Sequence, residues 1–308
     1  MPAKWVQIIM DVSIIIINYN TKDLIKQCID SVLEKTQDIE FEIIVVDNAS
    51  SDGSQQFIKN VYPNIIFIES PDNLGFGRAN NLGFEYAKGR NLFLLNSDTI
   101  LLNNAVKILS DYLDSNIEAG VCGGNLYDEK GSPVFSFSRS LSPVLSELNF
   151  FFKGILFKIM YRENIEFNHT SKPLKVGYIT GADMMLRSSV FGSAGQFDRD
   201  FFMYSEDIEL TYRIKKSGFS VYSVPDAHII HLIGRSSQDD YNKLKIMINS
   251  TNLYLKKTQG RFKRKIVRML IFLNIYSNIL SYKFYKKNNR KLKYWKSTLQ
   301  ISKVILDK

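Results

Sequence analysis

Apolar runs alternate with amphipathic segments along residues 12–126. Continuous runs of aliphatic and β-branched residues are typical of strands buried on both faces of a sheet. Five of them occur in this part of the chain, at 12–17, 41–46, 65–68, 92–95 and 120–126. Between the runs, apolar residues recur at helical spacing, over 24–33, after Ser54, over 75–87 and over 106–113. This alternation predicts an α/β fold with a mainly parallel sheet covered by helices on both faces.

The alternation stops after residue 127. The sequence there predicts a hairpin around 129–131, and an apolar, Phe-rich segment covers 148–160. A helix is predicted over 205–217. Short extended segments are predicted at 176–179, 184–186, 220–224 and 227–231.

Charge is unevenly distributed along the chain. The net charge is +9, but residues 255–308 contain 16 of the 40 basic residues and one of the 31 acidic residues. This segment therefore carries +15 and the rest of the chain −6. A basic segment on an acidic body favours an anionic partner, either nucleic acid or a membrane surface. We expect a main body, 11–237, with halves 11–126 and 127–237, and a basic C-terminal region, 238–308.

The composition, 45% hydrophobic and 23% charged, is typical of a folded globular protein. Cys28 and Cys122 have no metal-binding or redox spacing, so we expect reduced thiols in the core. No uncharged stretch reaches the roughly 18–20 residues of a membrane-spanning helix. The N-terminus shows no signal-peptide pattern.

Polar residues follow the ends of three predicted strands. Tyr19 follows the first strand, Asp47 and Asn48 the second, and Asp98 the fourth. Ligands of parallel sheets bind beyond the carboxyl ends of the strands, so we expect these side chains to lie at one site. The turn after the first strand contains no glycine, which disfavours a nicotinamide dinucleotide as the ligand.

A Gly-rich stretch, residues 73–81, follows the third predicted strand. In one explanation it opens a helix whose N-terminal amides face an anion, with Arg78 adding positive charge. In the other, the glycines only permit a tight turn and close helix packing. Spacing alone leaves both explanations open.

Two acidic segments are candidates for chemistry. Asn96 and Asp98 carry oxygens that suit Mg²⁺ or Mn²⁺, although an isolated Asp often only caps a helix. Glu206 and Asp207 open a predicted helix, where acids stabilise the helix dipole or where a carboxylate acts as general base. His231, one of three histidines, becomes important only beside a metal.

In this order, the segments resemble family 2 glycosyltransferases of the GT-A superfamily, and most closely the rhamnosyltransferase-like branch. The resemblance covers roughly 11–237, about three-quarters of the chain. It implies a GT-A nucleotide-diphospho-sugar transferase fold with a basic helical C-terminal appendage. The matching segments are 12–20, 43–53, 73–81, 94–99, 181–183, 197–198, 202–207, and His231 with 234–237.

The resemblance also implies roles for single residues toward the donor. Asp47 would hydrogen-bond the pyrimidine base, and Asn18 and Tyr19 would line the base and ribose. Arg78 and Asn80 would lie over the ribose or diphosphate. The residues expected to bind the donor or substrate are Asn18, Tyr19, Asp47, Asn48, Arg78, Asn80, Asn96 and Asp183.

The same resemblance implies the catalytic and metal residues. Asp207 matches the catalytic base of the family's Glu-Asp motif, in which Glu206 precedes it. Asp98 stands at the last position of the metal-binding DxD motif, and His231 at a position that supplies a second ligand. A divalent cation, Mg²⁺ or Mn²⁺, is therefore the expected cofactor. Asn96 replaces the first acid of the motif, which removes one negative charge.

The implied activity is an inverting glycosyl transfer (EC 2.4) to a hydroxyl of a glycan or lipid-linked saccharide, in bacterial surface polysaccharide synthesis. dTDP-rhamnose is the expected donor, with a UDP-hexose or UDP-galactofuranose as the alternative. A non-catalytic, sugar-nucleotide-binding assembly subunit is a further alternative, for which Asn96 is the only hint in the sequence. Acceptor choice is expected to reside in residues 127–180.

The C-terminal region contains 14 uncharged residues, 269–282, flanked by Lys and Arg on both sides. This run is too short to span a bilayer but suits an amphipathic helix in the interface of an anionic membrane. The alternative is a helical appendage that packs on the body or on a second subunit of a homo-oligomer. Nothing else resembles a nucleic-acid-binding module, which disfavours nucleic acid. We expect a cytoplasmic enzyme, peripheral on the inner face of the cell membrane.

Overall fold

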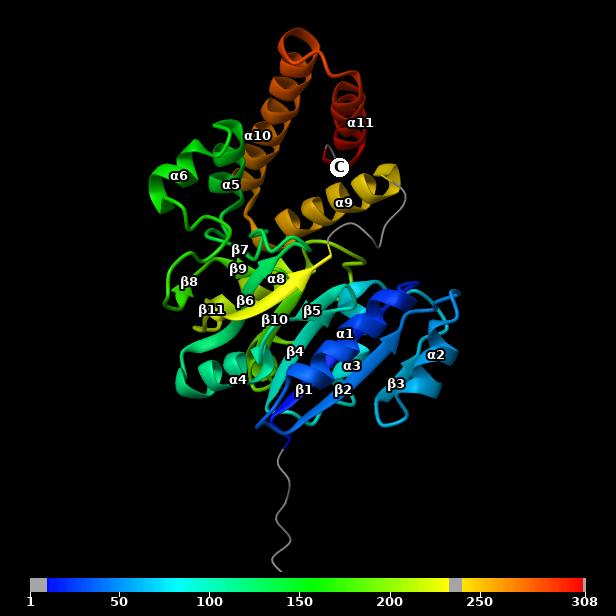
Figure 1. Cartoon of the computed structure of the whole chain (residues 1–308). Coiled ribbons are helices and arrows are strands. Elements are labelled where there is room, and N and C mark those ends of the chain that lie inside the picture. The colour runs from blue at the N-terminus through cyan, green and yellow to red at the C-terminus, as the bar shows by residue number, and fades with distance from the viewer. Residues whose placement is uncertain (1–9, 233–239, 307–308) are drawn as a thin grey trace, which may run out of the picture.

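The computed structural model describes residues 10–232 and 240–306. Figure 1 shows a twisted sheet flanked by helices in the lower part of the molecule and a group of helices above it. Every strand and helix predicted over residues 12–126 is present, and the short strand β5 is an addition. The elements of this half are β1 (Val12–Asn18), α1 (Lys22–Lys35), β2 (Phe41–Asp47), α2 (Ser54–Val61), β3 (Ile66–Glu69), α3 (Phe76–Phe84), β4 (Asn91–Asn96), β5 (Thr99–Leu101), α4 (Ala105–Ser115) and β6 (Ala119–Tyr127).

The second half differs from its prediction in two places. The expected hairpin is reduced to a turn after β6, closed by an isolated bridge between Tyr127 and Pro133. The two extended segments after 220 form one strand, whose pairing is irregular around Pro225, a residue without an amide hydrogen. The elements are β7 (Phe137–Ser138), α5 (Pro143–Phe151), α6 (Ile155–Tyr161), β8 (Leu174–Lys175), β9 (Tyr178–Ile179), β10 (Asp183–Arg187), α7 (Val190–Ala194), α8 (Glu206–Lys216) and β11 (Ser220–His231).

Within the described residues, nine strands form the main sheet. Its order is β3-β2-β1-β4-β10-β6-β11-β5, with β8 beside β11. The strands β3, β2, β1 and β4 are parallel, and β6 is parallel to β11. β10 runs antiparallel to both β4 and β6 and so joins the two halves of the sheet. The prediction of a mainly parallel, mixed sheet is confirmed.

Alternation along the strands divides the core into two layers, because successive side chains of a strand point to opposite faces. Ile14 and Ile16 of β1 pack on one face, in a cluster that includes buried residues of α1 and α4. Ile15 packs on the other face, with Phe84 of α3 and Leu210 of α8. Helices therefore cover both faces of the sheet, as predicted.

The C-terminal helices form an appendage on the body, as predicted. Their elements are α9 (Asp240–Thr258), α10 (Arg261–Leu280), a π-helical turn (Ser281–Tyr285) and α11 (Asn289–Leu306). Phe201 of the body packs with Leu255 and Val267 of the appendage. Lys257 Nζ lies 2.6 Å from a carboxylate oxygen of both Asp198 and Asp200. The expected boundary at residue 237 lies outside the described residues.

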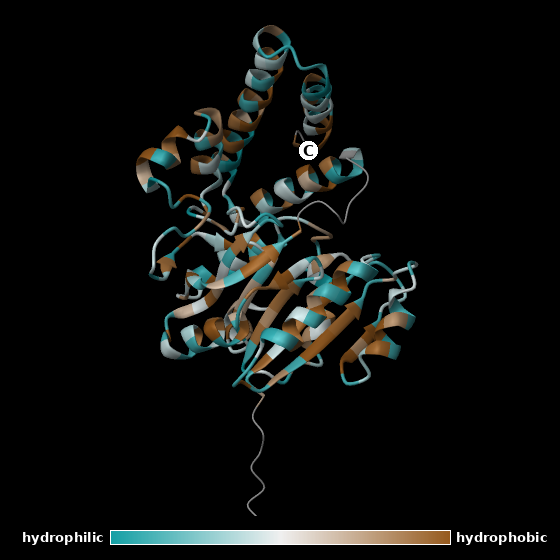
Figure 2. Cartoon of the chain, in the orientation of Figure 1, coloured by the Kyte–Doolittle hydropathy of each residue, from teal (hydrophilic) through white to brown (hydrophobic). Residues whose placement is uncertain are grey.

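Helix α10 contains most of the uncharged run, and its two faces differ. Leu270 and Ile275 are buried in the appendage, whereas Met269, Leu273 and Tyr276 are exposed. Figure 2 shows this mixture of apolar and polar residues along the upper helices, in contrast to the uniformly apolar central strands. Of the helices formed by the described residues, none is both long enough and apolar enough to cross a membrane.

Candidate active site

A cleft of about 570 Å³ lies beyond the carboxyl ends of β1 and β4, where the first turn of α8 faces them. Both halves of the body and helix α9 contribute to its walls. Seven residues singled out from the sequence line it: Tyr19, Asn48, Asn96, Asp98, Glu206, Asp207 and His231. The strand-end rule therefore predicted the position of the cleft correctly.

Asp98 and His231 form a pair on one wall of this cleft. Asp98 lies in the turn between β4 and β5, and His231 ends β11, where it pairs with Thr99 of β5. This strand pairing holds Asp98 Oδ1 3.3 Å from His231 Nε2. The amide of Leu232 donates to Asp98 O at 2.9 Å, a second contact between the end of β11 and this turn.

The chemistry of this pair fits a divalent cation that takes further ligands from a substrate. Mg²⁺ in proteins is commonly held by one or two carboxylates together with substrate phosphates. Asp98 offers a carboxylate, His231 an imidazole nitrogen, and Asn96 a neutral amide oxygen. Among residues 10–232 and 240–306, no three His, Cys, Asp or Glu side chains cluster as a metal site. The ligands from these residues alone would therefore leave the coordination incomplete.

Asp207 is tied to this wall through the backbone before β10. Asn96 N donates to Ala182 O at 3.0 Å. One residue earlier, Gly181 N donates to Asp207 Oδ2 at 3.1 Å, and Ile208 N donates to Asp207 Oδ1 at 2.8 Å. Both carboxylate oxygens of Asp207 thus accept an amide hydrogen, which orients the side chain and stabilises its ionised form.

Glu206 and Asp207 are neighbouring acids in different surroundings. Burial raises the pKa of both carboxyl groups, and the charge of Asp207 raises the pKa of Glu206 further. The amides of Ile208 and Gly181 act in the opposite direction on the pKa of Asp207. Glu206 Oε2 has no hydrogen-bond partner in the described part of the chain. The amides thus favour the ionised form of Asp207, whereas burial and the neighbouring charge favour the protonated form of Glu206.

A left-handed turn delivers this pair to the cleft. Tyr204 and Ser205, which precede α8, have φ angles of 70° and 65°. Residues with a side chain adopt this region at a cost of roughly 1–3 kcal/mol each, and such strain clusters at active sites. The turn places Tyr204 in the cleft wall with Glu206 and Asp207.

The Gly-rich stretch packs against the cleft. Gly75 has φ 78°, and a Cβ on it would lie 2.0 Å from Phe202 O. Phe76 N, the first amide of α3, donates to that oxygen at 3.0 Å. Asn48 Oδ1 accepts from Leu74 N at 2.7 Å and holds the turn at the end of β2. These contacts support close packing as the reason for the glycines.

Five predicted residues are not among those that line the cleft: Asn18, Asp47, Arg78, Asn80 and Asp183. Asp47 is buried and accepts from Asn18 Nδ2 at 2.7 Å. Asn80 donates to Phe76 O at 3.0 Å. Asp183 Oδ2 accepts from Gly124 N at 2.6 Å, and burial raises its pKa well above the usual range. The roles of these residues toward the donor stay predictions.

Four residues that line the cleft carry no signal in the sequence. Thr21 and Thr180 lie outside the matching segments, and Lys243 and Ile246 belong to α9 of the appendage. Only the tertiary packing of α9 on the body brings Lys243 and Ile246 to the cleft.

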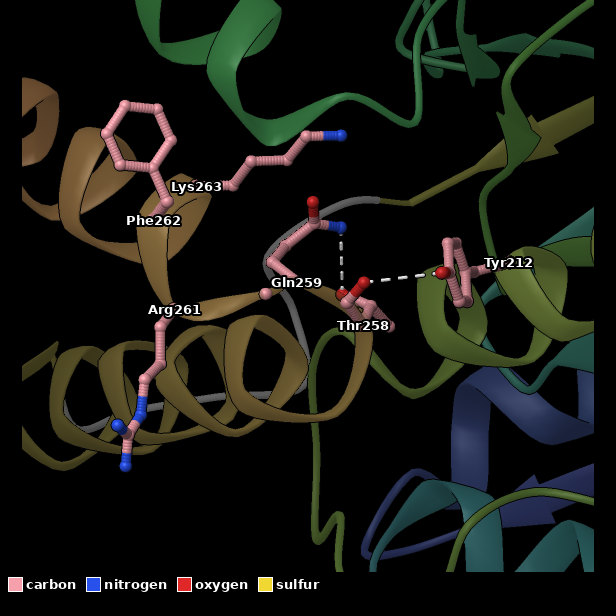
Figure 3. A pocket seen from close by; sticks show the side chains of 7 residues that line it. Tyr212, Thr258, Gln259, Arg261, Phe262 and Lys263 are labelled. Carbon is pink, nitrogen blue, oxygen red and sulfur yellow. Dashed lines mark hydrogen bonds between the residues drawn. The ribbon is translucent and has the colours of Figure 1, made fainter.

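A separate hollow of about 490 Å³ lies where α9 meets α10 (Figure 3). Tyr212 Oη donates to Thr258 O at 3.2 Å, and Gln259 Nε2 donates to Thr258 Oγ1 at 3.1 Å. The side chain of Arg261 points away from these groups. The seven residues around this hollow include no Asp, Glu or His.

The chain resembles known proteins in sequence and in fold. Residues 13–191 match the model of the family described as Glycosyl transferase family 2. Rhamnosyltransferase WbbL of Escherichia coli is 28% identical over 84% of this chain and 97% of its own length. N-acetylglucosaminyl-diphospho-decaprenol L-rhamnosyltransferase of Mycobacterium tuberculosis is 28% identical over 73% of this chain and 78% of its own length.

The fold is shared with solved GT-A structures. The mannosyltransferase PcManGT from Pyrobaculum calidifontis, in complex with GDP-Man and Mn²⁺, superposes with a TM-score of 0.59 over 95% of this chain and 86% of its own. Its sequence identity is 12%, so this similarity concerns the fold alone. The expected GT-A fold is confirmed.

Substitution Gly75→Ala tests the close packing beside the cleft. The new Cβ collides with Phe202 O, a backbone atom, so we expect a loss of about 2 kcal/mol or more in the free energy of unfolding. Chemical denaturation measures this loss. Gly192→Ala is the matched control, since no atom lies within 4 Å of its Cβ and it lies in helix α7, so the control should be neutral or stabilising. Equal stability of both variants would contradict the contact.

Substitution Glu206→Gln tests the environment of the acidic pair. A raised pKa in the folded state means that the native protein loses stability as the pH rises from about 4.5, the ordinary pKa of Glu. The neutral variant escapes this loss. We therefore expect its stability relative to the native protein to increase with pH, by at least about 1.4 kcal/mol, which corresponds to one pKa unit. Denaturation series between acidic and alkaline pH measure it. Glu85→Gln, at an exposed position, should follow the native curve.

Proposed function

The chain belongs to glycosyl transferase family 2 and is a glycosyltransferase, and on that premise we propose that it transfers rhamnose from dTDP-rhamnose, with inversion, to a hydroxyl of a glycan or lipid-linked saccharide of a bacterial surface polysaccharide. The observation that carries the proposal is the cleft in which Asp207 faces the Asp98–His231 pair. Two relatives named rhamnosyltransferases support the choice of sugar.

Asp207 is proposed as the general base. Its carboxylate takes the proton of the acceptor hydroxyl as that oxygen attacks the anomeric carbon of the donor. The bond from the anomeric carbon to the diphosphate breaks, and the nucleoside diphosphate leaves with the bonding electrons. Attack from the opposite face inverts the anomeric centre. Glu206 keeps its proton and does not compete with Asp207 for the role of base.

Asp98 and His231 are the residues that would hold Mg²⁺ or Mn²⁺. A divalent cation there would neutralise the charge that develops on the leaving diphosphate. Asn96 lies on the same wall, and Lys243 of α9 brings a positive charge to the cleft. Asn96 would offer a neutral oxygen in place of the acid, and phosphate oxygens of the donor would complete the ligand set.

The acceptor is proposed to approach from the side of residues 127–180. A second cavity, of about 510 Å³, lies between α5, α6 and α10. Asn149, Asn278 and Tyr178 are among its lining residues and offer amide and hydroxyl groups suited to a saccharide. Asp207 lies near enough to Tyr178 to contribute to its raised pKa, after the larger effect of burial. This cavity therefore adjoins the proposed base.

The basic C-terminal region, 255–308, is proposed to associate with an anionic membrane surface. The exposed face of α10 carries an apolar stripe with helical spacing, and Lys and Arg residues flank it. Amphipathic helices of this composition bind at the interface of anionic bilayers. The stripe consists of Phe262, Met269, Leu273, Tyr276 and Leu280.

Substitution Asp207→Asn separates donor binding from transfer. We expect unchanged affinity for the donor and a loss of transfer of at least about 100-fold, because the amide accepts no proton. Calorimetry measures the affinity, and release of the nucleoside diphosphate in the presence of acceptor measures the transfer. Asp226→Asn, at an exposed position on β11, is the control and should keep both properties. Full activity of Asp207→Asn would remove this residue from the mechanism.

A thermal-shift screen tests the donor and the metal residues together. We expect dTDP-rhamnose with Mn²⁺ to raise the melting temperature by mass action, and more than a UDP-hexose or UDP-galactofuranose does. In Asp98→Ala, the part of the shift that depends on Mn²⁺ should disappear, whereas Asp226→Ala should keep it. A larger shift in melting temperature with a UDP-sugar would contradict dTDP-rhamnose as the donor. An unchanged Mn²⁺ dependence in Asp98→Ala would contradict the metal assignment.

A further inference from the structure

Helices α5 and α6 are rich in apolar residues that the body does not cover. Their sequences are PVLSELNFF and ILFKIMY. None of the residues of α5 is buried, and Phe157 is the one buried residue of α6. A helix on the surface of a globular protein normally turns its apolar side toward the core. An uncovered apolar surface of this kind marks an interaction site.

The exposed apolar side chains gather at the link between the two helices. We call residues 143–161 the α5–α6 hairpin. Figure 1 shows it beside α10, to the side of the upper helices, and Figure 2 shows its apolar composition. Six of its large apolar residues are exposed by 40 to 75%: Phe150, Phe151, Phe152, Ile155, Ile159 and Met160.

The charges of the hairpin are positive where they are exposed. Lys153 lies in the link and Lys158 in α6, and both are exposed; Arg162 and Glu163, which follow the hairpin, are also exposed and carry opposite charges. The one acid of this segment, Glu147, faces α10, where Asn274 Nδ2 donates to its Oε2 at 2.6 Å. The outer surface thus combines aromatic and aliphatic side chains with cations, and Lys side chains of this kind extend to anionic headgroups.

We propose that the α5–α6 hairpin is a membrane-docking element that inserts its apolar residues into the interface of a bilayer rich in anionic lipid. Charge decides between a bilayer and a second copy of the chain. Two copies that met at this surface would bring Lys153 and Lys158 of both chains together, whereas anionic headgroups neutralise them. The hairpin is distinct in sequence from the basic region 255–308, so its contribution is measured separately.

Docking through the hairpin also suits the position of the second cavity. Phe150, Lys153 and Phe157 of the hairpin line this cavity, and Tyr178 of β9, a strand that packs against α8, lines it from the body. A lipid-linked saccharide held in the bilayer would therefore meet the cavity at the membrane surface. The docking itself does not depend on the proposed transfer reaction and is tested without a donor or an acceptor.

Flotation of the full chain with vesicles tests the proposal. The vesicles contain phosphatidylcholine with or without phosphatidylglycerol. We expect flotation with phosphatidylglycerol and a roughly tenfold or greater loss of partitioning in the triple variant Phe151→Ser, Phe152→Ser, Ile155→Ser, because exposed apolar groups lose the area they bury in lipid. The matched control is Ile117→Ser, which changes a residue that is 87% exposed in the body. This control should float like the native chain.

A second measurement does not require a loss of function. Ile155→Trp should show a blue-shifted emission on addition of phosphatidylglycerol vesicles, whereas Ile117→Trp should not. A triple variant that floats like the native chain, or an Ile155→Trp emission that does not move, overturns the proposal. Loss of flotation in the α10 variant Leu273→Ser, Tyr276→Ser, together with full flotation of the triple variant, also overturns it and assigns docking to the C-terminal region alone. Sedimentation that shows a native dimer broken by the triple variant, with flotation unchanged, assigns the surface to a second copy.

Discussion

Strand β10 hydrogen-bonds to β4 along one edge and to β6 along the other, and the segment that precedes it therefore crosses the end of β4. In that segment, Ala182 O accepts from Asn96 N, and Gly181 N donates to Asp207 Oδ2. One short stretch of backbone thus connects the turn that carries Asp98 with the helix that carries Asp207. Removing this antiparallel strand would leave each half of the sheet paired but the site unassembled.

The electrostatics of the site follow from where this framework places its acids. Glu206 and Asp207 are adjacent in sequence, yet backbone amides donate to the carboxylate of Asp207, whereas Glu206 Oε2 has no partner among residues 10–232 and 240–306. The Asp98 carboxylate is separated from that pair and faces an imidazole. Low polarity around buried groups strengthens each of these interactions, so small differences in hydrogen bonding are enough to give the acids different tasks.

Sequence patterns predicted much of the sheet and part of the cleft, and the limits have physical causes. Of the residues that the strand-end rule selected, Asn48 and Asp98 line the cleft. Asp47 is instead buried beside Asn18, because consecutive residues at a strand end point to opposite faces. The approach of His231 to Asp98 depends on pairing between β5 and β11, which periodicity does not reveal. The left-handed turn before α8 contains no glycine, so the sequence gives no sign of its positive φ angles.

Helix α9 supplies Lys243 and Ile246 to the cleft and binds the body through Lys257. The appendage is therefore part of the wall of this cleft. Chimeras that exchange C-terminal regions between related enzymes would replace that wall at the same time. A change made in the appendage thus also changes the cleft of the body.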